Sequence, residues 1–142
     1  MEKTKELFLK WWIKKYEIDN SISKYKVHKR QFWLYNIWIN IWNEESKDNN
    51  FLRPCLIINN YFKWDLILIL PLTSKFNEFL KDVYYKIEWQ KYWLDKDSYL
   101  LLNQFKVISK KRLIRKIDSD WEVVLFDEKE FLIILDKIKS LI

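Results

Sequence analysis

The chain has 142 residues, with 26 Lys and Arg, 20 Asp and Glu, a net charge of +6 and 49% hydrophobic residues. This length suits one domain with a real core, and the composition is too apolar for disorder. The absence of Gly excludes the Gly-rich phosphate loops of nucleotide-binding proteins. One Cys and one His exclude internal disulfides, Cys-rich zinc sites and mechanisms that need two histidines.

The N-terminal half begins with apolar residues at helical spacing, which predict an amphipathic helix over Lys3 to Glu17. A polar linker follows from Asp19 to Lys29. Aromatic and β-branched residues then predict a strand over Phe32 to Trp42. The segment Asn43 to Asn50 has no apolar residue and predicts a loop before a buried strand over Arg53 to Asn59.

The returning strand is predicted over Trp64 to Leu70, and Pro71 is expected to end it or lie at its edge because proline has no N–H for the ladder. A capping box at Asp127 and Glu130 predicts the start of a C-terminal helix. Between these, strands are predicted over Val83 to Trp89, over Tyr99 to Leu102 and Phe105 to Ile108 (one bent strand or two short ones), and over Leu113 to Ile117. Short strands between terminal helices predict an α+β fold with a small β-barrel, in which residues 1–23 form a helical extension and residues 24–142 the barrel domain.

Neither of the close carboxylate pairs predicts a metal site. Asp95 with Asp97 and Asp118 with Asp120 lack a partnering His and a Gly-bearing calcium loop, so we expect solvated loop charges and no cofactor. Cys55 lies in an apolar strand pattern, where a thiol usually packs. The longest apolar runs are far below the ~18 residues of a membrane span, and no signal-peptide pattern opens the chain. A soluble, cytoplasmic protein without membrane contact is expected.

Two basic groups are candidates for nucleic-acid binding. One spans Lys24 to Arg30, and the other comprises Lys110, Lys111, Arg112, Arg115 and Lys116. Beside exposed aromatic rings, such groups suit single-stranded nucleic acid, whose phosphates attract cations and whose bases stack on rings. The same pattern is also typical of a solvated surface.

A sharper constellation lies at the ends of two strands that we expect to pair. Arg53 opens one strand, and Thr73 and Ser74 follow the other. Together they offer a bidentate cation and two hydroxyl donors to one phosphate, with Glu44 in the preceding loop as a carboxylate. Taken alone, the same residues are more typical of an ordinary turn.

Five stretches, in order and spacing, resemble the PemK/MazF toxins of bacterial type II toxin–antitoxin systems. They are Gln31 to Trp33, Asn40 to Glu45, Phe51 to Ile58, Leu70 to Lys75 and Ser98 to Leu113. The resemblance covers about residues 26–117, and the N-terminal helix resembles an extension carried by one PemK-like branch.

The resemblance implies an SH3-like barrel, usually a homodimer, that cuts single-stranded RNA without a metal and is silenced by a cognate antitoxin. In the implied reaction a ribose 2′-OH attacks the adjacent phosphate, which leaves a 2′,3′-cyclic phosphate and a 5′-OH. Arg53 matches the catalytic arginine, Thr73 the catalytic threonine and Glu44 the acidic loop residue, our candidate base. The implied substrate-binding residues are Ser74, Gln104, Lys106 and Arg112.

Trp38 and Trp42 stand where the family normally carries glycines that form a tight loop. Two alternatives therefore stay open: a non-catalytic RNA-binding relative, or a toxin of the same fold that inhibits a protein target such as a topoisomerase. Nine Trp beside no Gly also suggest that some are UGA codons read as glycine in the source. The codons at both positions test this hypothesis.

Overall fold

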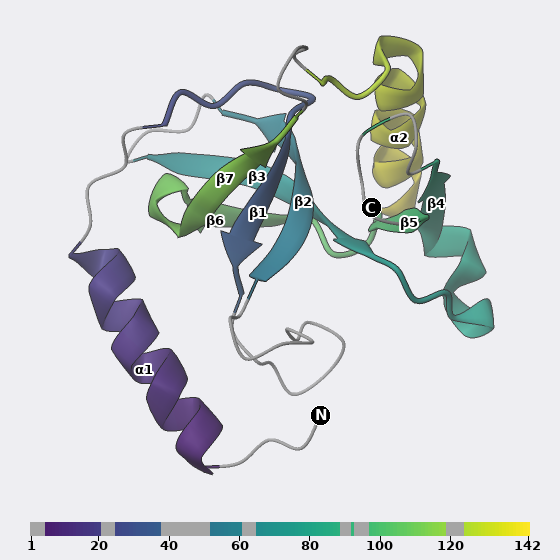
Figure 1. Ribbon diagram of the computed structural model, residues 1–142. Helices are drawn as coiled ribbons and strands as arrows, with labels where there is room; N and C mark the ends of the chain where they lie inside the picture. Colours follow the sequence, from purple (N-terminus) through teal and green to yellow (C-terminus); the bar gives the residue numbers. More distant parts are fainter. Residues whose placement is uncertain are drawn as a thin grey trace.

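The computed structural model describes residues 5–20, 25–37, 52–60, 65–88, 92, 97–118 and 124–142. Figure 1 shows a central antiparallel sheet with helix α1 (Lys5–Asp19) near one end and helix α2 (Glu128–Leu141) packed beside the other. None of the helices in the described part of the chain has the length and apolar character that a membrane span requires.

In the part of the chain that the structure describes, seven strands form the sheet in the order β4-β5-β3-β2-β1-β7, with β6 paired to β3 beside this path. Their bounds are β1 Phe32–Asn36, β2 Leu52–Asn59, β3 Leu66–Thr73, β4 Tyr84–Ile87, β5 Ser98–Leu101, β6 Lys106–Ser109 and β7 Leu113–Ile117. The predicted α+β class is confirmed. The predicted barrel is not closed among the described strands: β3 pairs with β6 along its first half and with β5 at its end, so the sheet branches there.

Pro71 does not end β3, contrary to the expectation from sequence, but lies buried inside it opposite Cys55. The N–H of Ile57 donates to the carbonyl of Gln31 at 2.9 Å, so the backbone N–H and C=O of Ile57 point toward β1. Those of Cys55, two residues earlier, point the same way. Pro71, opposite Cys55, then points its nitrogen away from β2. On that side β3 changes neighbour from β6 to β5, so a missing N–H leaves no ladder bond unmade there.

The strands bury both faces of the sheet, because side chains alternate along each strand. One face carries Trp33, Tyr35, Cys55, Ile57, Ile67 and Ile69, which pack with Val27, Ile37, Ile108 and Leu113. The other carries Phe32, Leu56, Leu70, Leu72 and Leu100 and packs against Phe131 and Ile134 of α2. The sheet, covered on both faces, holds in place the edge at which β2 begins and β3 ends.

A hydrogen-bonded network joins α2 to the sheet at the predicted capping box. Asp127 is the N-cap, and its Oδ2 accepts from the N–H of Glu130 at 3.1 Å. The Glu130 carboxylate accepts from the hydroxyls of Tyr85 at 3.0 Å and Tyr92 at 2.8 Å. The N–H of Asp127 donates to the Tyr92 hydroxyl at 3.2 Å, so Tyr92 takes the role that Glu130 has in a simple capping box.

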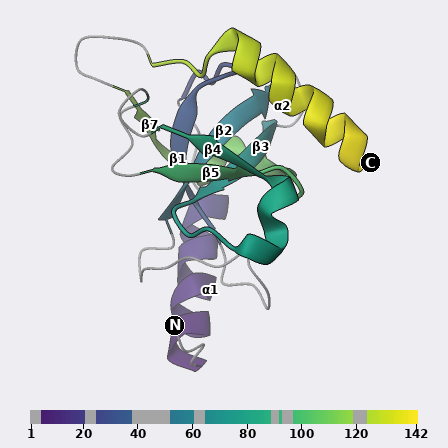
Figure 2. The ribbon, with the colours of Figure 1, turned by 90° about the vertical axis from the view of Figure 1, so that its right-hand side faces the viewer.

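Helix α1 confirms the predicted N-terminal helix, but it buries a narrower stripe than expected. Leu7, Trp11 and Ile18 are buried, whereas Trp12 and Tyr16 are exposed. The helix lies beside the short 3-10 helix η3 (Lys110–Arg112), far from α2 (Figure 2). The sequence did not predict η3, nor the 3-10 helix η1 (Glu78–Val83), because both are too short to show a periodicity.

Among the described residues, two adopt the left-handed backbone region that glycine usually fills. Arg30 has φ 72° and Asp65 has φ 57°. Arg30 is held by three contacts: its N–H donates to Ile57, its carbonyl accepts from Phe126, and its Nε donates to the Phe126 carbonyl at 2.7 Å. Asp65 accepts from the N–H of Lys110 through its carbonyl and forms an ion pair with the Lys110 ammonium at 3.8 Å.

Candidate active site

Arg53 lies near the start of β2, opposite Tyr35 of β1, and is only 7% exposed. Its Nη1 is buried and has no hydrogen-bond partner among the described residues. A buried guanidinium stays charged and is costly to leave unpaired. This charged N–H donor is therefore suited to bind an anion.

Thr73 is the last residue of β3 and lies at the same end of the β2–β3 pair as Arg53. Cys55 and Pro71 face each other, and Arg53 and Thr73 each lie two residues beyond them, on the same face of the sheet. Thr73 is 8% exposed, and its Oγ1 accepts from the N–H of Lys75 at 3.2 Å. Since that bond uses a lone pair of the hydroxyl, its hydrogen remains available to donate to a ligand.

Gln104 and Lys106 lie on the other side of β3. Lys106 opens β6 opposite Ile69, two residues before Pro71. Gln104 lies in the connection before β6, where its N–H donates to the carbonyl of Leu101 at 3.1 Å, and its Oε1 is buried without a partner among the described residues. Four of the predicted site residues thus come from the strands and connection around the end of β3: Arg53, Thr73, Gln104 and Lys106.

The other three predicted residues are placed differently. Ser74 lies in a bend directly after Thr73, outside β3. Arg112 lies in η3, between β6 and β7, and its guanidinium stacks over the indole of Trp11, 5.8 Å from the ring centroid. Glu44 lies outside the described residues, as do Trp38 and Trp42.

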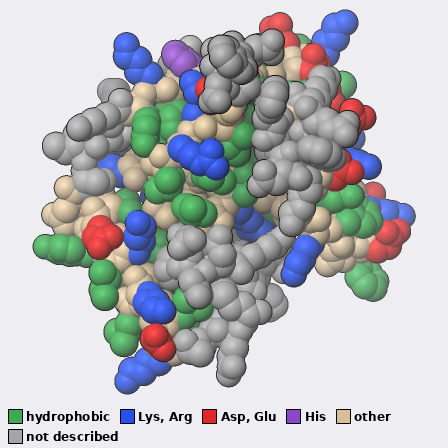
Figure 3. All heavy atoms as spheres, in the orientation of Figure 1, with side chains coloured by type: hydrophobic (Ala, Val, Ile, Leu, Met, Phe, Trp, Pro, Cys, Tyr) green, Lys and Arg blue, Asp and Glu red, His purple; other side chains and the backbone are tan. Residues whose placement is uncertain are grey.

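Several members of the basic groups are engaged within the chain rather than presented to a partner. Lys111 donates to the carbonyl of Asp19 at 3.0 Å, and Lys116 pairs with Asp118 at 3.3 Å. Figure 3 shows basic and hydrophobic side chains mingled across the middle of one face, with acidic ones mostly over the side of α2 and η1. The view shows no single strongly basic patch on this face.

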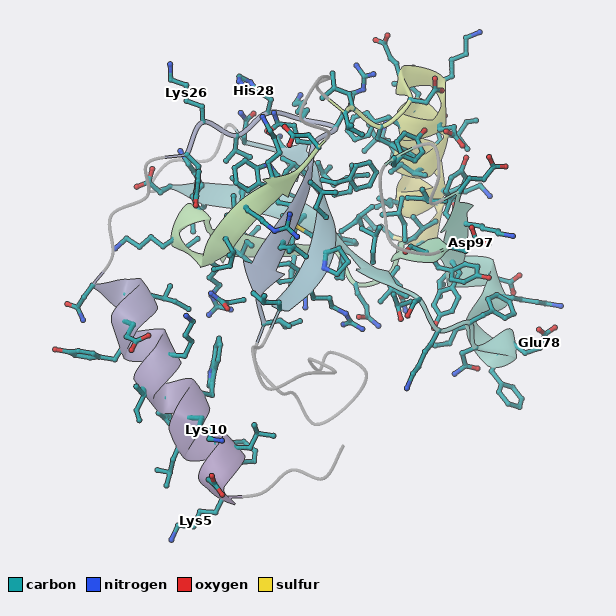
Figure 4. All side chains as sticks on the ribbon, in the orientation of Figure 1. Lys5, Lys10, Lys26, His28, Glu78 and Asp97 are labelled. Atoms are coloured by element: carbon teal, nitrogen blue, oxygen red, sulfur yellow. The ribbon has the colours of Figure 1, made fainter. Side chains whose placement is uncertain are left out.

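The structure gives neither the one histidine nor the one cysteine a place among the candidate site residues. His28 lies beside Lys26 at the end of β1 opposite to the end that meets Arg53 (Figure 4). Cys55 is fully buried, and burial raises the pKa of its thiol far above the ordinary value, so it stays protonated and packs, as predicted. Within the described ranges, no group of three or more His, Cys, Asp or Glu side chains is placed to hold a metal ion.

Sequence reasoning did not single out two residues near this end of the sheet. Asn36 is 1% exposed, and neither polar atom of its amide has a partner among the described residues. Tyr99 lies directly opposite Thr73 on β5. An asparagine inside an apolar strand pattern was the available signal for the first; the second depends on a strand pairing that a single sequence does not show.

Taken together, the edge of the sheet where β2 begins and β3 ends presents a buried cation and a hydroxyl donor. A phosphate oxygen would accept from both the guanidinium and the hydroxyl. The arrangement is therefore suited to binding a phosphodiester and to stabilising charge that develops on it.

Comparison with known proteins identifies the family. Residues 34–142 match the family described as PemK-like, MazF-like toxin of type II toxin–antitoxin system. The structure is similar to that of the Mycobacterium tuberculosis toxin MazF-mt6, with a TM-score of 0.53 and 12% sequence identity over 76% of this chain and 93% of that chain. At this identity the structural similarity shows the fold alone, and the membership in the family rests on the family match. The chain belongs to the PemK-like, MazF-like toxins of type II toxin–antitoxin systems.

Proposed function

We propose that this toxin is an endoribonuclease that cleaves single-stranded RNA by transphosphorylation, without a metal ion. The observation that carries the proposal is the buried Arg53 guanidinium, whose Nη1 has no hydrogen-bond partner in the part of the chain that the structure describes, across the β2–β3 pair from Thr73. In a protein of this family, a phosphodiester is the ligand that such a donor set fits best.

In the proposed reaction the ribose 2′-oxygen attacks the adjacent phosphorus, and the bond from phosphorus to the 5′-oxygen breaks. Glu44 takes the proton of the 2′-OH, and the 5′-oxygen leaves as a 5′-OH after gaining a proton. Arg53 stabilises the negative charge on the phosphorane oxygens, and the Thr73 hydroxyl donates to one of them. Ser74, Gln104 and Lys106 hold the flanking RNA.

The proposal extends to the assembly in which the toxin acts. Residues 24–142 would form the catalytic domain and residues 1–23 an extension, in a cytoplasmic homodimer held inactive by a cognate antitoxin. The net charge of +6 supports a negatively charged substrate or partner.

The test is incubation of the purified protein with a mixed-sequence single-stranded RNA in EDTA. We expect discrete fragments that end in 2′,3′-cyclic phosphate and begin with 5′-OH. Arg53→Ala should abolish them, with an unchanged circular dichroism spectrum. Lys129→Ala, which removes one positive charge from the exposed surface of α2, is the matched control and should cleave normally.

Two other results would replace the proposal. Retarded migration of intact RNA would indicate a non-catalytic RNA-binding relative. Growth inhibition that survives Arg53→Ala, without RNA cleavage, would indicate a toxin of the same fold with a protein target.

A further inference from the structure

The candidate site continues along the sheet in a row of side chains that the proposed reaction does not use. Tyr35 lies opposite Arg53, Thr73 lies opposite Tyr99, and Tyr99 lies opposite Lys86. Directly opposed residues of antiparallel strands point to the same face, with Cβ atoms about 5 Å apart. The row therefore leads from the buried Arg53, through Thr73, onto the ring of Tyr99.

Tyr99 belongs to a cluster of three rings, which we call the aromatic platform: Phe76, Tyr84 and Tyr99. The Phe76 centroid lies 5.3 Å from that of Tyr99 and 5.7 Å from that of Tyr84, and the two tyrosines are 5.9 Å apart. Phe76 is 47% exposed, although three neighbouring aromatic residues would normally bury one another. The platform thus offers ring surface to solvent directly beside Thr73.

Charges around the platform nearly cancel. Lys86 is paired with Asp97 at 3.7 Å, and Lys75 and Lys81 are offset by Glu78 and Asp82 in the same segment. Figure 4 shows Glu78 and Asp97 on this side of the molecule, away from α1. A surface with balanced charges does not attract phosphates. The ligand that suits the platform is an uncharged flat group, attached to a phosphate that is bound at a neighbouring site.

We propose that the aromatic platform stacks a nucleobase of the RNA nucleotide that flanks the phosphate held by Arg53 and Thr73. The inference rests on the proposed function and adds a base-binding subsite to it. Division of labour follows from the geometry: Arg53 and Thr73 bind the backbone, and Phe76 and Tyr99 bind a base. Stacking on rings tolerates every base, so the platform contributes affinity and register rather than sequence choice.

The test uses a short RNA that contains the cleavage site mapped in the assay above, made uncleavable by replacing the attacking 2′-OH with hydrogen. Phe76→Leu keeps an apolar side chain but removes the ring. We expect it to weaken binding by about 5- to 100-fold, the effect of losing one stacked base. Tyr16→Ala, which removes an exposed aromatic ring from α1, is the matched control and should bind normally.

A second readout reports stacking itself. With 2-aminopurine on one side of the uncleavable phosphate, binding to the native protein should quench its fluorescence, and binding to Phe76→Leu at saturation should not. The salt dependence of binding should be the same for both proteins, because the ring contributes no counterion release.

Three results would overturn the inference while leaving the proposed function intact: unchanged affinity of Phe76→Leu with Arg53-dependent cleavage, an equal loss of affinity for an RNA that is abasic at both flanking positions, or no quenching at either flank. Failure of the native protein to bind or cleave RNA would instead reject the proposed function.

Discussion

Two polar clusters in this molecule are withdrawn from solvent, and they treat their hydrogen bonds in opposite ways. In the network beside α2, Glu130 accepts from Tyr85 and Tyr92, and Asp127 is bonded through both its carboxylate and its N–H. Arg53 at the start of β2 and Gln104 in the connection before β6 each bury a polar atom that has no hydrogen-bond partner among the described residues. A satisfied network stabilises a fold, whereas unsatisfied buried groups cost stability and mark a place for a ligand.

The sharpest way to break this comparison is Arg53→Met, which keeps the length of the side chain and removes its charge. RNA cleavage should fall at least about a hundredfold, as expected for the loss of one charge-stabilising group. The free energy of unfolding should stay the same or rise, because the variant no longer buries a charged group whose Nη1 lacks a partner among the described residues. Cleavage rates and urea denaturation measure the two effects, and a strongly destabilised but active variant would reverse our assignment of Arg53.

Glu130→Ala should have the opposite signature. Removal of the carboxylate takes the partner from two tyrosine hydroxyls and should lower the free energy of unfolding by about 2 kcal/mol. Activity per folded molecule should not change. Glu128→Ala, in the exposed first turn of the same helix, is the control and should stay within about 0.5 kcal/mol of the native protein.

Asp127→Ala removes only the cap of α2 and should cost about 1 kcal/mol, while Asp127→Asn, which keeps an acceptor for the Glu130 N–H, should cost less. Thermal melts of the two variants distinguish a capping effect from one of charge. Equal losses would indicate that the carboxylate acts at long range rather than as a cap.

The smallest effect is on alkaline stability. Burial, together with the hydrogen bond to Glu130 and its charge, raises the pKa of Tyr85 to about 12, above an ordinary value of 10.0. Between these values the unfolded chain has lost the phenol proton that the folded chain keeps, so stability falls as pH rises from about 10 to 12. Tyr85→Phe should flatten that part of a plot of denaturation midpoint against pH. An unchanged slope would contradict the assignment.

Local patterns predicted the elements that local chemistry determines. The strand over Leu113–Ile117 and the cap at Asp127 agree with the prediction, and the strand from Arg53 differs by one residue at its start. The wrong expectation at Pro71 arose because only the branching of β3 between β6 and β5 makes a missing N–H harmless there. Branching depends on long-range pairing, which no window of sequence contains.

The candidate site shows the same division. Arg53 and Thr73 were predicted as neighbours from strand ends and family resemblance, and β2–β3 pairing places them at one end of one face. The pairing of β5 with β3 places Tyr99 beside Thr73. Arg112 contacts Trp11 instead of the site. Both depend on residues distant in sequence.

A chain without glycine still needs a left-handed backbone in places, and within the described ranges it uses Arg30 and Asp65 there. Each non-glycine residue in that region costs about 1 kcal/mol or more. Here the strain is offset by bonds of the same residues, to Phe126 for Arg30 and to Lys110 for Asp65. Replacement by glycine would remove the strain and the side-chain bond together, so its effect should be near neutral, whereas valine would keep the strain and lose the bond. The mutational tolerance of these two positions is therefore inverted: the smallest residue is accepted and the β-branched one is not.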